Sequence, residues 1–347
     1  MSDTRRALLS ALADGPVSGP ELADRLDISR AAVWKHVESL RDEGFVVESE
    51  SDGYVVTEVP EYGGPAIEYG LEADYDVAFH DVLGSTNDTA RELASEGESD
   101  VVVVAREQSA SKGRKERAWT APDGGVWMSV LIRPDEPPAF APLYTLAMAV
   151  AVCDAAREAG VDASIKWPND VIVSRPSKRA TSDGSSDSVE SDGVIVSESS
   201  DDSPDTDASD HDYRKLCGIL TEMEGEADRV SWLVIGPGIN VNIAPEELPE
   251  EATSVSAEAS PVERRIFVQR VLERFDELRA DLDSVLPAWR ERADTLGRRV
   301  RVHTANGVVE GEAIGIEHPG TLVVRTDDGE TRVHAGDCEH LRPVAET

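Results

Sequence analysis

The sequence predicts an α+β protein built from several domains. The first 59 residues contain three helical periodicities followed by a hairpin pattern, whereas residues 71–293 alternate apolar strand-like runs with helical stretches. With 347 residues the chain is long enough for two or three domains. We therefore expect an N-terminal domain at 1–59, a linker at 60–70, a central domain at 71–293 and a C-terminal domain at 294–347.

The N-terminal domain has the pattern of a winged helix-turn-helix. Helical segments are expected at 4–13, 18–25 and 31–43, and Gly44 ends the third. A hairpin at 45–56 follows the third helix and gives the winged form. The residues expected to face DNA from the third helix are Ser29, Arg30, Trp34, Lys35 and His36. A module used only for protein contacts remains the alternative.

Two segments outside the central strands and helices have distinctive compositions. From residue 294 onward, short alternating runs are interrupted by glycines, which predicts a small β-barrel. Within the central domain, the Asp/Ser-rich insertion at 174–212 has the composition of a disordered segment. We interpret it as a solvated loop that joins two neighbouring strands, with a regulatory role as the alternative.

The segment Lys-Trp-Pro-Asn-Asp at 166–170, here called the KWPND segment, combines a cation, an aromatic ring, an amide and a carboxylate. Strand-like patterns at 161–165 and 171–173 flank it, so a sheet would present these groups at its rim. The proline requires an edge, a bulge or a break there. We interpret the segment as part of a site; the alternative is a polar turn with the tryptophan packed beneath it.

Two earlier segments are also polar where an element ends or begins. Ser85, Thr86 and Asn87 precede an amphipathic stretch and could simply cap a helix. After the apolar strand 101–105, the loop at 108–119 gathers lysine and arginine around one glycine in an otherwise acidic protein. One guanidinium group can bind two phosphate oxygens at once, so this loop is suited to binding a phosphate. A solvated charged turn is the alternative.

Two later segments bring charge and glycine to strand-like runs. Lys215 lies at the head of the apolar strand 213–222, so we expect its position to be fixed by the sheet. Residues 234–242 resemble a glycine-rich loop around Gly236 and Gly238. A dinucleotide-binding fingerprint is a poor interpretation, because a proline separates the glycines and no helix pattern follows.

Together these segments resemble the biotin protein ligase family, in the form that carries an N-terminal repressor domain. The resemblance covers nearly the whole chain: the Ser-Thr-Asn motif, the basic loop, the KWPND segment, the RKLxGIL strand at 214–220, the GxGxN loop at 236–240 and the C-terminal barrel follow the family's order. It implies a catalytic domain like that of the class II synthetases, with a mixed sheet flanked by helices, and an SH3-like C-terminal barrel.

The resemblance also implies the activity. A biotin–[biotin carboxyl-carrier protein] ligase uses biotin and ATP, with Mg²⁺ accompanying ATP and no dedicated metal site in the protein. It forms biotinyl-5′-AMP and transfers biotin to a lysine of the biotin carboxyl carrier protein of an acetyl- or propionyl-CoA carboxylase. A biotin-responsive repressor that binds operator DNA, and a homodimer, are further implications.

The resemblance carries over to individual residues. The implied catalytic residues, which would neutralise charge at phosphorus, are Lys215 and Arg114. The residues implied in biotin binding are Ser85, Thr86, Asn87, Gln108, Lys112, Gly113, Arg114, Trp119, Lys215 and Gly218. Those implied in ATP and adenylate binding are Lys112, Arg114, Arg117, Lys166, Asn169, Asp170, Gly236, Gly238 and Asn240. The basic loop departs from the family pattern at Ser111 and Glu116, where the family has glycine.

Composition adds expectations about the environment. The formal net charge is −35, and such an acidic surface stays hydrated in concentrated salt, which is typical of a halophilic protein. We expect no apolar run long enough to span a bilayer and no signal segment, and therefore a cytoplasmic protein without membrane partners. Cys153, Cys217 and Cys338 are isolated in sequence, which supports neither disulfides nor a zinc site.

Two other functions remain open at this point. One is a lipoate or octanoate transferase of related fold, and the other is a ligand-sensing repressor without catalysis. A transferase that acts without ATP would not need a phosphate-binding loop. A catalytically inactive sensor would have no need of Lys215 and Arg114.

Overall fold

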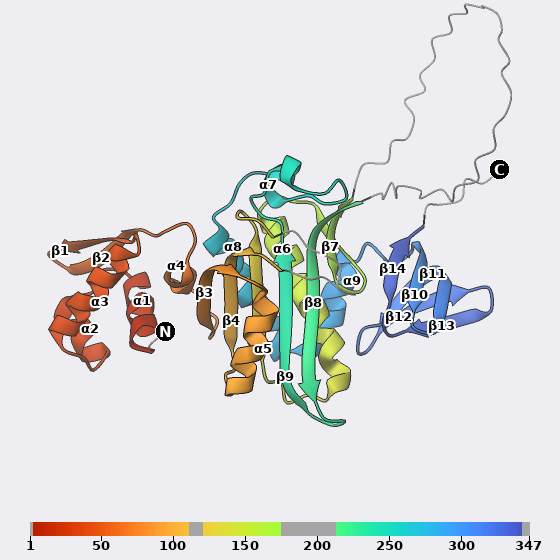
Figure 1. Cartoon of the computed structure of the whole chain (residues 1–347), viewed down its shortest axis with the longest axis horizontal. Coiled ribbons are helices and arrows are strands. Elements are labelled where there is room, and N and C mark those ends of the chain that lie inside the picture. Colours follow the sequence, from red (N-terminus) through yellow and green to blue (C-terminus); the bar gives the residue numbers. More distant parts are fainter. Residues whose placement is uncertain (1–2, 111–120, 175–212, 342–347) are drawn as a thin grey trace, which may run out of the picture.

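The computed structural model describes residues 3–110, 121–174 and 213–341. Three units follow one another along the longest axis of the molecule, and Figure 1 shows them in chain order: a small helical unit, a central unit built on a large sheet, and a small all-β unit. The domain boundaries proposed above remain predictions.

The N-terminal unit is a bundle of three helices with a hairpin. Its elements are α1 (Asp3–Ala13), α2 (Gly19–Arg25), α3 (Arg30–Asp42), β1 (Val46–Glu50) and β2 (Gly53–Glu58). Ser18 and Ser29 cap α2 and α3, since each hydroxyl oxygen accepts a hydrogen bond from the backbone N–H three residues later. The predicted helix-turn-helix with a following hairpin is confirmed.

The central unit is built on a seven-stranded mixed sheet with the order β3-β4-β5-β9-β8-β7-β6. β3 and β4 pair in parallel, and the other neighbouring pairs are antiparallel. The strands are β3 (Asp76–Leu83), β4 (Val101–Gln108), β5 (Val126–Ile132), β6 (Ala163–Lys166), β7 (Asp170–Ser174), β8 (Tyr213–Gly225) and β9 (Val230–Ile239). The predicted mixed sheet is confirmed.

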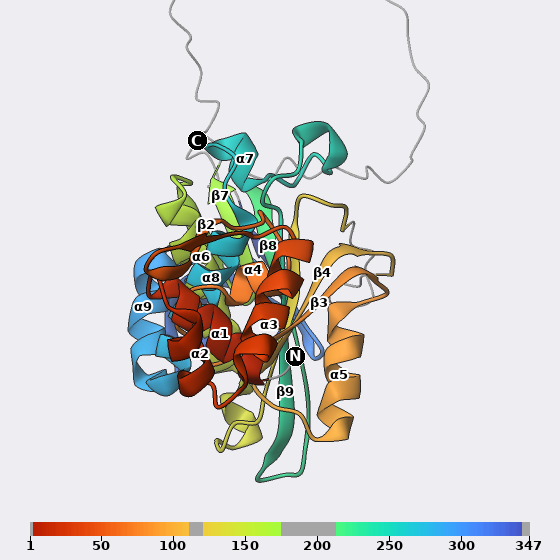
Figure 2. The same ribbon diagram turned by 90° about the vertical axis from the view of Figure 1, so that its left-hand side faces the viewer.

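Helices cover both faces of this sheet, as Figure 2 shows for α5 on one side and α6, α8 and α9 on the other. The helices are α4 (Gly64–Glu68), α5 (Thr86–Glu96), α6 (Ala141–Glu158), α7 (Val255–Glu258), α8 (Arg264–Ala280) and α9 (Val285–Arg292). Along β4, Val101 and Val103 belong to the core under α5, whereas Val102 and Val104 belong to the core under α6. Burial on both faces explains the unbroken apolar run of this strand.

The expectation that no apolar run could span a bilayer is wrong. The segment Pro138–Glu158, which contains α6, is long and apolar enough by length and composition, with a mean hydropathy of 1.6 in its most apolar window. In the fold, 67% of that window is buried, because α6 packs between the sheet and α8. Its apolar surface therefore forms the core of the central unit.

The C-terminal unit is a five-stranded antiparallel sheet with the order β13-β12-β11-β10-β14. Its strands are β10 (Arg299–Thr304), β11 (Gly307–Glu317), β12 (Thr321–Thr326), β13 (Gly329–Val333) and β14 (Asp337–His340). Buried side chains of this sheet, such as Val300, Leu322 and Cys338, belong to the same continuous core as the central unit. The C-terminal sheet is thus packed onto the central unit and shares its core.

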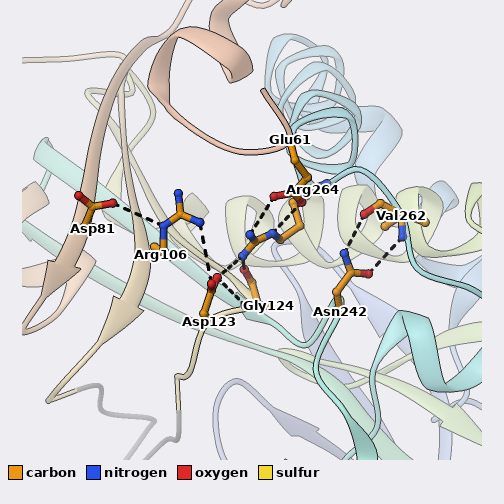
Figure 3. Close-up of polar contacts among 9 residues, drawn as sticks. Glu61, Asp81, Arg106, Asp123, Gly124, Asn242, Val262 and Arg264 are labelled. Atoms are coloured by element: carbon orange, nitrogen blue, oxygen red, sulfur yellow. Dashed lines mark hydrogen bonds and ion pairs between the residues drawn. The ribbon is translucent and has the colours of Figure 1, made fainter. Parts of the chain in front are cut away.

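One arginine at the start of α8 fixes the linker to the central unit (Figure 3). The guanidinium of Arg264 donates to both carboxylate oxygens of Glu61 at 2.9 Å and to Asp123 at 2.7 Å. It also lies 4.2 Å from the ring centroid of Tyr62. The Arg264 side chain is only 7% exposed. An unpaired Arg264 guanidinium buried at this position would be strongly destabilising. The ion pair with Glu61, which belongs to the linker, therefore determines where the linker docks.

Candidate functional site

A cluster of neutral polar side chains lies where α5 begins. Ser85 is the N-cap residue of α5, but its side chain forms no capping hydrogen bond. The backbone N–H of Thr86 donates to Oε1 of Gln108 at 2.7 Å, which joins the start of α5 to the end of β4. The buried hydroxyl of Ser129, on β5, lies 2.7 Å from Thr86 Oγ1 and 2.6 Å from Asn87 Oδ1. Three elements therefore converge on this cluster.

Asn87 is held at the centre of the cluster, directly against a glycine. Its Nδ2 donates to Glu222 Oε2 at 2.7 Å, while Ser129 contacts its Oδ1. A Cβ atom on Gly236 would lie only 2.1 Å from Asn87 Oδ1. Only glycine at position 236 leaves room for the amide in this place, and the two hydrogen bonds keep it there.

Glycines form a floor beside this cluster. Asp170, Gly218 and Gly238 lie opposite one another on β7, β8 and β9. Gly236 is two residues from Gly238 along β9, and alternate residues of a strand share a face. The three glycines 218, 236 and 238, here called the glycine floor, therefore lie on one face of the sheet, with the Asn87 cluster at one end and Asp170 at the other.

The segment that contains Gly236 and Gly238 is the strand β9, so the expected loop is wrong. β9 is an inner strand between β5 and β8. In the β5–β9 ladder, Met128 and Ser129 have no paired residue on β9. Pro237 lies in this gap, where a residue of a continuous ladder would have to donate a backbone hydrogen bond. Since proline has no N–H, this gap in the ladder is what allows it inside the sheet.

A β-bulge in β8 aims Lys215 at the glycine floor. The ladder between β7 and β8 shifts register so that Leu216 has no opposite residue. One extra residue reverses the alternation of side chains, and Lys215 therefore points to the same face as Gly218. The Lys215 Nζ atom lies 2.7 Å from Asp170 Oδ1, and a Cβ atom on Gly218 would lie 2.8 Å from that nitrogen.

Lys166 brings a second ammonium group to the same end of the floor. Its buried Nζ atom lies 3.7 Å from Asp170 Oδ2 and 5.2 Å from the ring centroid of Tyr213. Burial alone would lower the pKa of Lys166, but the charge of Asp170, followed by Tyr213, outweighs burial and the pKa is raised. Lys166 therefore remains positively charged at neutral pH.

The rest of the KWPND segment forms the turn between β6 and β7. Trp167 is 1% exposed and packs beneath the turn. Asn169 ties the turn to β8, because its Nδ2 donates to the carbonyl of Ile219 at 2.8 Å and its own carbonyl accepts from the Ile219 N–H at 3.0 Å. The tryptophan is structural, as the alternative interpretation has it, while Lys166 and Asp170 lie at the polar end of the floor; their part in a site stays a prediction.

Asn240 follows β9 and lies beside the same end. Its backbone N–H donates to the carbonyl of Leu216 at 3.0 Å, next to Lys215. Its side chain is buried, and within the described part of the chain its Nδ2 atom has no hydrogen-bond partner. A buried donor without a partner costs about 1–3 kcal/mol, so this nitrogen is suited to an acceptor atom of a ligand.

Some of the predicted site lies outside the described residues. The predicted residues concerned are Lys112, Gly113, Arg114, Arg117 and Trp119, and the acidic insertion from 175 to 212 lies outside as well. Of the ranges that the structure does describe, none contains a group of three His, Cys, Asp or Glu residues that could hold a metal ion. Cys217 is buried, and burial raises its thiol pKa, so it packs in the core and is not an activated nucleophile.

The candidate DNA-facing residues lie on and beside α3. Arg30, Trp34 and Lys35 are exposed, and His36 is half-buried. Trp34 is 57% exposed, so its ring is accessible on the surface of α3. Ser29 precedes the helix as its N-cap.

The sequence did not identify Ser129 and Glu222 as site residues. Ser129 is the single hydroxyl in the otherwise apolar strand Val126–Ile132, and that isolated polar group is the signal that was available. Glu222 lies among other polar residues near the end of β8, so its local pattern does not distinguish it from a solvent-facing carboxylate. Its contact with Asn87 arises only from the packing of α5 on the sheet.

Comparison with known proteins assigns a description to each unit. Residues 79–240 match the biotin/lipoate A/B protein ligase family. Residues 4–55 match a helix-turn-helix domain, and residues 295–341 match the biotin protein ligase C-terminal domain.

Similarity extends along nearly the whole chain. The chain is 35% identical to the bifunctional ligase/repressor BirA of Bacillus subtilis (strain 168), over 93% of this chain and 93% of that protein. It is 27% identical to the protein of the same name from Escherichia coli (strain K12), over 92% of each. The biotin protein ligase from Aquifex aeolicus in complex with biotin and ATP shares the fold, with a TM-score of 0.58 at 21% identity, over 78% of this chain and 100% of that one.

Proposed function

The chain belongs to the bifunctional ligase/repressor family, and from that membership we propose that it is an ATP-dependent biotin protein ligase and a biotin-responsive transcriptional repressor. The ligase forms biotinyl-5′-AMP and transfers biotin to a lysine of a biotin carboxyl carrier protein. The observation that carries this proposal is the glycine floor, which has a neutral polar cluster at one end and two ammonium groups at the other.

The neutral end suits the ureido ring of biotin. A urea is uncharged and offers both donors and an acceptor, so it is matched by neutral groups of both kinds. Ser85, Thr86, Asn87 and Gln108 supply such groups at the start of α5 and the end of β4. Glycine at 236 leaves room for the Asn87 amide beside the sheet, and Ser129 and Glu222 keep that amide oriented.

The cationic end suits the carboxylate of biotin and the α-phosphate of ATP. Gly238 lies two residues, or about 7 Å, from Gly236 along β9, which is the direction in which the acyl chain of biotin would extend. Lys166, Lys215 and the unpartnered Nδ2 of Asn240 gather there. Asp170 holds both ammonium groups in position, so little reorganisation is needed when negative charge develops at phosphorus.

The chemistry then needs no nucleophilic side chain. A carboxylate oxygen of biotin attacks the α-phosphorus, the bond to pyrophosphate breaks, and Mg²⁺ enters with ATP. The amine of the carrier lysine next attacks the acyl carbon, and AMP leaves. Positioning and charge stabilisation by fixed groups supply the rate enhancement. We assign further roles in this site to Lys112, Gly113, Arg114, Arg117, Trp119, Asn169 and Gly218.

The finer features of the protein form part of the same proposal. We expect α3 to bind operator DNA, the chain to form a homodimer in the cytoplasm, and the five C-terminal strands to close as an SH3-like barrel. The acceptor would be the carrier protein of an acetyl- or propionyl-CoA carboxylase. The net charge of −35 supports function in concentrated salt.

Pyrophosphate release tests the enzymatic part. The full chain, incubated in molar potassium chloride with ATP and Mg²⁺, should release pyrophosphate only when biotin is present. Lipoate or octanoate in place of biotin should not support release. Addition of a biotin carboxyl carrier domain should give a protein whose mass has increased by one biotinyl group. Absence of biotin-dependent pyrophosphate release would refute the ligase assignment.

A further inference from the structure

Two residues near and within the C-terminal sheet accept hydrogen bonds from the tryptophan of the KWPND segment. The buried backbone N–H of Trp167 donates to Oγ1 of Thr295 at 2.9 Å. The indole Nε1 of the same tryptophan donates to the carbonyl of Gly320 at 3.0 Å. Thr295 lies between α9 and β10, and Gly320 between β11 and β12. Both polar groups of Trp167 are therefore satisfied by residues more than 120 positions further along the chain.

A buried threonine and histidine extend this contact into the C-terminal sheet. Thr295 is fully buried, and its Oγ1 lies 3.1 Å from Nε2 of His340 on β14. His340 Nδ1 lies 3.4 Å from Asp294 Oδ2, so the carboxylate is next to this ring nitrogen. With the imidazole proton on Nδ1, facing the carboxylate, Nε2 accepts the Thr295 hydroxyl proton. The threonine oxygen is then free to accept the Trp167 N–H.

Asp294, Thr295 and His340, here called the array, also contact the cationic end of the site directly. The His340 ring lies edge-on to the Tyr213 ring, with 5.7 Å between the ring centroids. Tyr213 in turn lies beneath the ammonium group of Lys166. The Asp294 N–H donates to the carbonyl of Ile165 at 2.9 Å, immediately before Lys166. Lys166 is thus held on its backbone by one part of the array and on its side chain by another.

We propose that Thr295 and His340 are positioning residues for the activation step, and that they set the place of Lys166 and Asp170 through the backbone of Trp167. The inference rests on the proposed ligase function and extends it to the C-terminal unit. In the described part of the chain, no hydrogen bond joins the neutral cluster around Asn87 to this array. Loss of the array should therefore impair the use of ATP more than it weakens biotin binding, because the ureido ring is held at the other end of the floor.

The first test removes one hydroxyl. Thr295→Val keeps the shape of the side chain but leaves the Trp167 N–H and His340 Nε2 without their partner. We expect the KM for ATP in biotin-dependent pyrophosphate release to rise at least tenfold, since a misplacement of about 1 Å in a site can cost about 100-fold. The biotin dissociation constant, measured by calorimetry without ATP, should rise by a smaller factor than the KM for ATP. Thr295→Ser, which restores the hydroxyl, should recover the KM.

The C-terminal sheet offers a matched control. Thr321 is also buried, and its Oγ1 lies 2.9 Å from Nδ1 of His334. In the described part of the chain, neither side chain of this second threonine–histidine pair is hydrogen-bonded to the KWPND segment, although Thr321 follows Gly320. Thr321→Val should leave the KM for ATP unchanged. An equal rise in KM for both valine variants would show a general effect of the C-terminal sheet and would overturn the positioning role.

The pH dependence supplies a readout that a purely structural role would not change. Burial, and then the nearby charge of Lys166, lower the pKa of His340, while Asp294 opposes them. The groups that face the ring are Asp294, Lys166, Arg298 and Tyr213. Because the pKa of His340 is lowered from the ordinary histidine value, the ring is neutral at neutral pH, and protonation in acidic solution removes the acceptor of the Thr295 hydroxyl. The KM for ATP of the wild type should therefore rise at acidic pH.

His340→Gln should remove this acidic rise, because the glutamine amide does not titrate in that range. If Thr295→Val does not fold, the pH profile of His340→Gln decides. A His340→Gln variant that retains the acidic rise, or a Thr295→Val variant with a wild-type KM for ATP, would overturn the proposal. A wild-type protein without biotin-dependent pyrophosphate release would instead refute the proposed function.

Discussion

Single glycines determine what the candidate site can hold. A side chain at 236 would overlap Asn87, and one at 218 would overlap the end of Lys215. Neither glycine has a positive φ angle, so each is required for space and not for backbone conformation. The floor of the site is therefore defined by the absence of side chains as much as by the polar groups around it.

Gly236→Ala tests this interpretation. The new Cβ would lie 2.1 Å from Asn87 Oδ1, and the amide cannot move away without losing its contacts with Ser129 and Glu222. We expect the biotin dissociation constant to rise at least tenfold, or about 1.4 kcal/mol, as measured by calorimetry.

Gly315→Ala is the matched control, because a Cβ there would have no neighbour within 4 Å. This variant should bind biotin as the wild type does. Biotin affinity within twofold of wild type for Gly236→Ala would remove the glycine floor from the binding site.

Lys215 is the side chain on which we expect the chemistry to depend most. Its Nζ contacts Asp170 and adjoins the glycine floor. Loss of one fixed charge contact to a developing anion typically costs about 3–4 kcal/mol, so Lys215→Ala should slow pyrophosphate release by about 100- to 1,000-fold. Biotin affinity in the absence of ATP should remain within a fewfold of wild type.

Arg325→Ala is a suitable comparison, since it removes an exposed cation from β12, where Arg325 pairs with Glu312. Its rate should equal that of the wild type. Normal pyrophosphate release by Lys215→Ala would mean that another cation performs this role.

At the scale of elements, the register between β7 and β8 explains how a long insertion can join them. Ser174 at the end of β7 pairs directly with Tyr213 at the start of β8. The two strand ends are therefore adjacent, and a hairpin turn of two to five residues could span them as well as the natural connection does. The candidate site residues on these strands, Asp170 and Lys215, are held by the sheet itself.

Replacement of residues 175–212 by a short Asn-Gly turn should therefore preserve the ligase. We expect the rate of pyrophosphate release and the KM for ATP to stay within threefold of wild type, because the Ser174–Tyr213 pairing supplies the register. A decrease of more than tenfold, or about 1.4 kcal/mol of transition-state stabilisation, would show that the insertion contacts the site or the carrier protein.

At the scale of the whole molecule, two units with different tasks are joined by a docked linker. Arg264 holds Glu61 and Tyr62 against the central unit. The start of the linker that follows the helix-turn-helix is therefore fixed in position. Between residues 1 and 60, twelve Asp or Glu face six Lys or Arg. We therefore expect weak attraction to phosphates and base contacts from α3 that supply most of the discrimination.

Footprinting in molar potassium chloride tests the repressor role. The full chain should protect a site upstream of a biotin-related gene, and protection should strengthen when biotin and ATP are present. The double variant Arg30→Ala/Lys35→Ala should lose the protected site while its rate of pyrophosphate release is unchanged. No ligand-dependent protection would mean that the helix-turn-helix serves another partner, and the ligase assignment would stand.

Features that depend on a few adjacent residues could be determined from the sequence alone. The helix-turn-helix has its capping serines within three residues of the N–H groups they bind, and its apolar periodicity is local. The KWPND segment, the Ser-Thr-Asn motif and Lys215 are recognisable by residue type, spacing and order. These features were sufficient to predict the class of the fold, its order along the chain and the family.

Only the tertiary structure decided how the site is assembled. The bulge at Leu216 reverses the direction of Lys215, and a gap in the β5–β9 ladder admits Pro237 into a central strand. Glu222 reaches Asn87 across 135 residues, and Thr295 reaches Trp167 across 128. Such contacts depend on strand register and on the packing of distant elements, and neither leaves a periodic signal in the local sequence.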